Sequence, residues 1–248
     1  MISIEELNEA KEIRKTNSYY AEKEYLQFIF LNAISKYPES FIFKGGTCLR
    51  ICYGLERASE DLDFSTSPKI AEIKKIVIKC LKDFELLGID YNIYAEKEFN
   101  KNLRMEIRFQ GPLYKGNLRS TNTLKIDFNK GKVKNKLAKV IPKIFSDVPL
   151  FILIAMDEKE ILAEKIRSLL NRKEPRDLYD IWALLSKGAE LDKNLIYEKL
   201  KEENSDISQL KFPSKQDYEI SLKNLVFVLP SYEQVVREVS AKLDVLRK

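Results

Sequence analysis

The sequence predicts an α+β fold in which a mixed β-sheet flanked by helices is followed by a helical C-terminal region. Short segments of alternating apolar residues recur between helical stretches in the first part of the chain. The pattern becomes helical from Asp157 onward. The 248 residues, 44% of them hydrophobic, are enough for one large domain or two modest ones. We therefore expect one domain over residues 1–155 and a helical domain over residues 156–248.

Strands are expected where apolar residues alternate with polar ones, or where short apolar runs are bounded by turn residues. These segments are residues 41–43, 61–65, 91–94, 103–109, 121–128 and 150–154. The pair Gly45-Gly46 turns the chain after the first segment, and Gly111-Pro112 separates the fourth from the fifth.

Helices are expected where capping residues precede an amphipathic pattern. Ser3 and Glu6 form a capping box for the first helix. Pro68 lies at the first position of a long helix that ends near Gly88. The other helices are expected over residues 18–35 and 47–53, from Asp157 to Pro175, over residues 176–187, and after Lys193, Ser214 and Ser231.

The composition excludes several kinds of chemistry. The chain has no histidine, which excludes a Ser-His-Asp triad, a histidine base and a His-ligated metal. Its three cysteines are an odd number without a CxxC pair, which argues for a reducing compartment and against a zinc site. The N-terminus is charged at once, and the longest apolar run, residues 148–156, is too short to cross a membrane. We expect a cytoplasmic protein that does not span a membrane.

Positive charge is concentrated in residues 97–143. The chain has a net charge of +5, but this segment has 13 Lys or Arg residues against three acidic ones, which leaves +10. A local excess of this size is typical of a surface that binds phosphates or nucleic acid. A solvated, lysine-rich surface without a ligand explains the charge alone equally well.

The most informative residues are Gly45-Gly46-Thr47 and the pair Asp61 and Asp63. Side chains at positions i and i+2 of a strand share one face, so the two aspartates lie side by side. Adjacent carboxylates repel each other unless a cation lies between them, and Mg²⁺ binds through one or two carboxylates plus substrate phosphates. Glycines let backbone N–H groups face a triphosphate without a Cβ in the way, and Thr47 could add a hydroxyl. This pattern predicts a metal-dependent nucleotide site.

Neighbouring residues extend this hypothesis and also offer a simpler one. The aspartates could instead pair with Arg57, and Lys44 could either add a cation to the site or point away from it. Two-metal phosphoryl chemistry usually requires a third carboxylate on a neighbouring strand. Asp127 is the first candidate, and Glu106 is the alternative, although Glu106 could equally be a cross-strand partner of an arginine.

Two candidates lie in the helical region. Lys165 falls inside the apolar arc of its predicted helix, so its amine either extends along an apolar wall to solvent or points into a site that holds a triphosphate. Asp177 and Asp180 lie on adjoining positions of the next helix. The simplest interpretation of these acids is a favourable first-turn arrangement in which Arg176 pairs with Asp180.

Together these segments resemble the nucleotidyltransferase toxins of the AbiEii/AbiGii family, within the DNA polymerase beta superfamily. Three blocks carry the resemblance: residues 43–64, residues 124–127, and residues 164–180. Each block alone is weak, but their order and spacing over most of the chain are quite specific.

The resemblance implies a nucleotidyltransferase fold whose helical second domain completes the active site, and it implies roles for matching residues. A site for Mg²⁺, with two metals and with Mn²⁺ as an alternative ion, would be formed by Asp61, Asp63 and Asp127. The residues that would contact the nucleotide are Gly45, Gly46, Thr47, Ser59, Lys165 and Asp177. The essential acid of the last motif would be Asp180, with Asp177 as the alternative.

The implied reaction is transfer of NMP from an NTP to an RNA acceptor, with the 3′ end of tRNA as the expected target. In this family such enzymes act as toxins that a cognate antitoxin neutralises. The basic segment would bind the RNA, with an affinity that weakens as salt rises. Two alternatives are nucleotidyl transfer to a small molecule or a protein hydroxyl, and a non-catalytic module that binds nucleotide or RNA.

Overall fold

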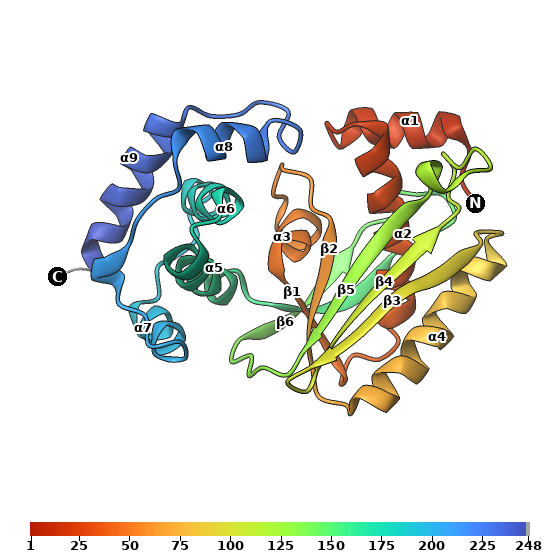
Figure 1. Ribbon diagram of the computed structural model, residues 1–248, viewed down its shortest axis with the longest axis horizontal. Helices are drawn as coiled ribbons and strands as arrows, with labels where there is room; N and C mark the ends of the chain where they lie inside the picture. The colour runs from red at the N-terminus through yellow and green to blue at the C-terminus, as the bar shows by residue number, and fades with distance from the viewer. Residues whose placement is uncertain (247–248) are drawn as a thin grey trace. The chain divides into compact units, whose positions relative to one another are not determined.

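A computed structural model describes residues 1–246, which divide into two compact units. Unit 1 extends from Met1 to Met156 and contains a seven-stranded sheet with helices α1 to α4; unit 2 begins at Asp157 and contains α5 to α9 (Figure 1). The predicted α+β fold is confirmed. In the described part of the chain, no helix combines the length and the apolar character needed to span a bilayer.

The elements have the following bounds. The strands are β1 (Phe41–Lys44), β2 (Asp61–Thr66), β3 (Tyr91–Phe99), β4 (Asn102–Phe109), β5 (Asn122–Asn129), β6 (Lys136–Ile141) and β7 (Phe151–Met156). The helices of unit 1 are α1 (Ile4–Ile13), α2 (Ser18–Ile34), α3 (Gly45–Tyr53) and α4 (Ile70–Leu86). Those of unit 2 are α5 (Glu158–Arg172), α6 (Pro175–Ser186), α7 (Lys193–Lys201), α8 (Lys215–Leu222) and α9 (Tyr232–Leu243).

The sheet is mixed, with the strand order β3-β4-β5-β2-β1-β7-β6. The pairs β2–β5 and β1–β7 are parallel, and the other four pairs are antiparallel. Strands β2 and β5 are therefore neighbours, although α4, β3 and β4 lie between them in the sequence. This pairing brings the predicted acidic pair next to the strand that carries the predicted third carboxylate.

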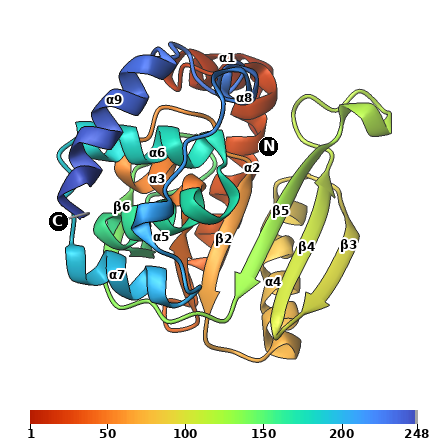
Figure 2. The same cartoon turned by 60° about the vertical axis from the view of Figure 1, so that its left-hand side comes forward.

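Apolar side chains of β2, β4 and β5 all point to the face that the helices cover. Phe64 of β2 is 1% exposed and stacks on Phe128 of β5, with 5.6 Å between ring centroids. The ring centroids of Phe84 in α4 and Phe109 in β4 are 4.4 Å apart. Both figures show α4 running along this side of the sheet (Figures 1 and 2). Because side chains alternate along a strand, the intervening residues of β2 and β5 face the other way.

Two helix starts differ from the prediction. Helix α3 begins at Gly45, so the glycine pair forms its first turn instead of a separate turn before it. Helix α4 begins at Ile70, so Pro68 lies before the helix and not at its first position. Ser67 and Pro68 precede the helix, and Nζ of Lys130 donates to the carbonyl oxygens of both.

The sequence analysis missed strand β6 and underestimated β3, which continues to Phe99. Strand β6 is the last strand of the sheet and carries lysines at positions 136 and 139, so its apolar alternation is weak. Lysine on an edge strand discourages pairing with other chains, which explains why an edge strand has so little hydrophobic signal. The predicted helices after Lys193, Ser214 and Ser231 are confirmed as α7, α8 and α9.

Candidate active site

The candidate site is built by the register of the central strands. Lys44 pairs with Asp63 across β1 and β2, Asp63 pairs with Asp127 across β2 and β5, and Asp127 pairs with Arg104 across β5 and β4. Residues paired in register point to the same face of a sheet. Four charged side chains therefore form one row across four strands, with the two carboxylates in the middle.

A second row runs parallel to the first, two residues away along the strands. Asp61 pairs with Lys125, and Lys125 pairs with Glu106. Asp61 and Asp63 share a face because the buried Leu62 between them takes the opposite one. Glu106, the alternative third carboxylate, thus lies beside a lysine and one row away from the pair Asp63 and Asp127.

Asp127 is buried and held by an arginine fork. It is 7% exposed, and its Oδ1 and Oδ2 accept hydrogen bonds from Nε and Nη2 of Arg104 at 2.8 and 3.0 Å. This hydrogen-bonded carboxylate raises the pKa of the Arg104 guanidinium above its ordinary value. The pKa of the Asp61 carboxyl is also raised, chiefly by burial; Lys125 opposes the shift, and Glu60 and Asp127 add to it.

Gly45 and Gly46 are required by close contacts with site side chains. A Cβ on Gly45, whose φ is +78°, would lie 2.4 Å from Oδ2 of Asp63. A Cβ on Gly46 would lie 2.5 Å from Nη2 of Arg57 and 3.1 Å from Oγ of Ser59. The glycine pair therefore lets the start of α3 approach β2 and the loop before it.

Thr47 is fully buried and fastens α3 to β2. Its hydroxyl donates to the backbone carbonyl of Asp61 and shares a hydrogen bond of 2.9 Å with the hydroxyl of Ser59. These contacts account for the choice of threonine. The prediction that Thr47 and Ser59 contact the nucleotide stays a prediction.

In unit 2, Lys165 lies in a buried ion cluster. Its Nζ is 2.8 Å from Oδ1 of Asp177 and 2.8 Å from Oδ2 of Asp180, and the side chains of these acids are 1% and 0% exposed. Arg172 adds a second cation, with Nε 2.8 Å from Oδ2 of Asp177. The amine of Lys165 is thus turned toward the two acids. The structure brings the three predicted residues of this unit together, and their predicted roles toward the nucleotide stay predictions.

Comparison with known proteins places the chain in a family. Residues 29–242 match the family described as "Nucleotidyl transferase AbiEii toxin, Type IV TA system". The chain belongs to this family. It is a nucleotidyltransferase of the AbiEii toxin family, as the resemblance implied. A comparison with curated protein sequences finds no match.

Solved structures show the same fold at low sequence identity. JHP933 from Helicobacter pylori is 21% identical, with a TM-score of 0.63 over 93% of each chain. MenT4, a nucleotidyltransferase toxin from Mycobacterium tuberculosis, is 19% identical, with a TM-score of 0.61 over 100% of each chain. These two structures support the fold of the chain.

The donor set of this AbiEii enzyme fits Mg²⁺ through two carboxylates. Asp61 and Asp63 lie on one face of one strand, both are partly exposed, and carboxylate oxygens are the ligands that Mg²⁺ prefers. Within residues 1–246, no group of three acidic, histidine or cysteine side chains is gathered as a metal site. The third candidate, Asp127, is the carboxylate held by Arg104.

The basic segment of the AbiEii enzyme lies on β3 to β6 and the loops that connect them. Most of its lysines and arginines are exposed, including Lys115, Arg119, Lys125 and Lys136. Sequence analysis found this excess of charge but missed Arg104 as a site residue. Only the register of β4 against β5 identifies it, and no short motif marks that register.

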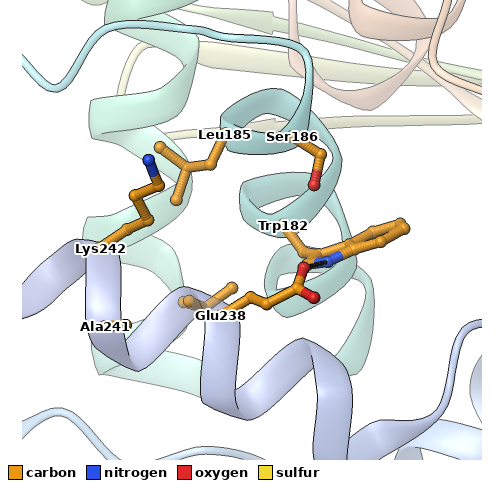
Figure 3. A pocket seen from close by; sticks show the side chains of 7 residues that line it. Trp182, Leu185, Ser186, Glu238, Ala241 and Lys242 are labelled. Carbon is orange, nitrogen blue, oxygen red and sulfur yellow. Dashed lines mark hydrogen bonds between the residues drawn. The ribbon is translucent and has the colours of Figure 1, made fainter.

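A hollow in unit 2 is separate from the predicted residues. It has a volume of about 600 Å³ and lies between α6 and α9. Figure 3 shows Trp182 and Glu238 pointing toward each other there, and indole Nε1 donates to Oε2 of Glu238 at 2.7 Å. The remaining lining residues are Leu185, Ser186, Val239, Ala241 and Lys242. None of the predicted catalytic residues lines this pocket.

Proposed function

We propose that this AbiEii enzyme transfers NMP from an NTP to the 3′-hydroxyl of an RNA acceptor, with tRNA as the target, and that it acts as a toxin controlled by an antitoxin. The observation that carries the proposal is the row in which Asp63 and Asp127 are paired in register beside Gly45. The family establishes nucleotidyl transfer; the acceptor and the metal are the proposed parts.

The 3′-hydroxyl oxygen attacks the α-phosphorus of the NTP and forms the new phosphodiester bond, while the bond between the α- and β-phosphates breaks and pyrophosphate leaves. The proton of the hydroxyl passes to a carboxylate of the site, with Asp127 as the candidate, or to solvent. Asp61, Asp63 and Asp127 would hold Mg²⁺, or Mn²⁺ in its place. When bound, such ions stabilise the charge on the attacking and leaving oxygens.

The chain's own groups supply position and charge. Gly45 and Gly46 form the first turn of α3, where backbone N–H groups have no partner within the helix and favour an anion such as a phosphate. Asp63 lies against Gly45, so the same turn fixes the place of its carboxylate. The exposed lysines and arginines of residues 97–143 fit the phosphate backbone of an RNA.

The test is transfer of label from each α-labelled NTP to total tRNA in the presence of Mg²⁺. We expect label on RNA with wild-type protein and none with Asp63→Asn. The control is Asp83→Asn, which removes a carboxylate paired with Lys36 on the other side of unit 1 and should leave transfer unchanged.

Two outcomes would contradict the proposal. Label on the protein itself, or on a small molecule, with none on RNA would favour the alternative acceptors. Full activity of Asp63→Asn would exclude the assignment of the acidic pair. Growth arrest on expression, absent with Asp63→Asn, would connect the transfer to the toxin role.

A further inference from the structure

Arg104 is hydrogen-bonded to Asp127, one of the three carboxylates on which the proposed reaction depends. Both oxygens of Asp127 accept hydrogen bonds from the Arg104 fork, at 2.8 and 3.0 Å. A divalent cation bound at Asp127 would lie close to this guanidinium, and two positive charges at that distance repel each other. In the described structure both oxygens of the Asp127 carboxylate are therefore bonded to Arg104.

The other two carboxylates are arranged differently. Asp61 and Asp63 share one face of β2, whereas both oxygens of Asp127 accept hydrogen bonds from Arg104 of β4. This agrees with the absence of a three-carboxylate group among residues 1–246. The full set of ligands therefore requires Asp127 to be released from its arginine.

Arg104 is suited to exchange its partner. Its side chain is 48% exposed, whereas that of Asp127 is 11% exposed, so solvent and solutes reach the arginine end of the pair. The planar guanidinium fork binds phosphate as well as carboxylate. Because the guanidinium reaches solvent, turning from Asp127 to another anion does not leave a buried cation without a partner.

We propose that Arg104 holds Asp127 in the absence of substrate and moves its guanidinium to a phosphate of the incoming NTP, which releases Asp127 to the metal. The inference rests on the proposed function, in which Asp63 and Asp127 bind the metal of a nucleotidyl transfer reaction. It makes assembly of the metal site depend on the arrival of the nucleotide.

The experiment compares Arg104→Gln and Arg104→Lys with the wild-type protein. The control is Lys74→Gln, which breaks a surface ion pair with Glu96 and Glu98 outside the row. Circular dichroism would confirm that each variant is folded. The probe is Mn²⁺ alone, titrated without nucleotide or RNA by calorimetry or by electron paramagnetic resonance of free Mn²⁺.

Arg104→Gln should bind Mn²⁺ about tenfold more tightly than wild type, the effect of removing one charged competitor. The same variant should have a KM for NTP raised by about tenfold, because a charge-assisted phosphate contact is lost, with a smaller change in kcat. Arg104→Lys keeps the charge but lacks the guanidinium fork, so its Mn²⁺ affinity and its KM for NTP should lie between those of wild type and Arg104→Gln. Lys74→Gln should match wild type in both measurements.

Tighter binding of metal together with weaker binding of NTP is a combination that a merely structural arginine would not produce. Equal or weaker Mn²⁺ affinity in Arg104→Gln would overturn the proposal, as would an unchanged KM. The Mn²⁺ titration involves no RNA and no turnover, so it reports on Arg104 even if the proposed RNA acceptor is wrong.

Discussion

Gly45 and Asp63 are in such close contact that a side-chain carbon on the glycine would lie 2.4 Å from Oδ2 of the aspartate. The contact joins the first turn of α3 to the acidic pair of β2. It explains why a glycine is needed at this position, apart from any contact with phosphate.

We predict that Gly45→Ala destabilises the protein and abolishes nucleotidyl transfer. The positive φ alone costs about 1–2 kcal/mol for a residue with a Cβ, and the displaced carboxylate adds to this. Gly88→Ala is the matched control, since Gly88 has a φ of +68° and no atom within 4 Å of the added Cβ. Urea unfolding should show a loss in both variants, but only Gly45→Ala should lose activity. Retained activity would mean that Asp63 can move without consequence.

Thr47→Val should lower stability because the Thr47 hydroxyl fastens α3 to β2, and the KM for NTP tests separately the predicted contact of Thr47 with the nucleotide. The substitution conserves volume but removes the hydroxyl that bonds to the part-buried carbonyl of Asp61 and hydroxyl of Ser59, at a cost of about 1–3 kcal/mol. Thermal unfolding and steady-state kinetics measure the two effects separately. A large rise in KM without a loss of stability would instead support direct contact between Thr47 and the nucleotide.

Lys165→Met should destabilise unit 2 by about 3–5 kcal/mol, because it leaves the buried Asp177 and Asp180 without their shared cation. Arg172→Gln is the comparison. Its side chain is 58% exposed, so loss of its pair with Asp177 should cost only about 0–1 kcal/mol. Chemical denaturation checks both values. Loss of activity in Lys165→Met is informative only where the variant is shown to be folded.

Binding of RNA should weaken as salt rises, and the dependence should fall when basic residues are removed. The double variant Lys115→Gln/Arg119→Gln should reduce the slope of log K against log salt by about 1–2, one phosphate contact for each residue. Lys79→Gln on α4 is the control, since Lys79 is exposed but lies outside the basic segment. A slope unchanged by the double variant would place the RNA elsewhere.

Stability should fall above about pH 9. Burial raises the pKa of the Cys80 thiol from 9.0 to about 12, and burial with a hydrogen bond to Asp147 raises the pKa of the Tyr25 hydroxyl. The native state therefore keeps protons that the unfolded chain releases, and stability declines as pH rises from the unfolded pKa toward the folded one. Unfolding midpoints between pH 8 and 11 measure this, and Cys80→Ala should flatten the decline. A midpoint independent of pH over this range would contradict the prediction.

The sequence predicts the strands and helices with strong patterns, and it predicts the residues that share a strand. Asp61 and Asp63 lie on one face of β2 because residues two positions apart in a strand point the same way. Asp127 could be proposed from alternation in its strand, and its register with Asp63 agrees with that choice. The shared faces could be predicted because they depend on periodicity, whereas the role of Asp127 stays a prediction.

What the sequence did not reveal depends on pairing between distant segments. The partner of Asp127 is Arg104, 23 residues away along the chain, and that contact follows from the register of β4 and β5. The expected pairing of Arg176 with Asp180 overlooked Lys165, which reaches the same acid from α5. Strand β6 was missed because an edge strand has no need of two apolar faces.

The parallel pairing of β2 with β5 also has a consequence for synthesis of the chain. A ribosome completes β2 at Thr66 but must add α4, β3 and β4 before β5 begins at Asn122. Pairing β2 with β5 across this long stretch of sequence is a slow, non-local step in folding. A nascent or prematurely terminated chain that ends before β5 carries the acidic pair without Asp127, so under the proposed function it should have no transfer activity. The topology delays assembly of this toxin's chemistry until more than half of the protein has been made.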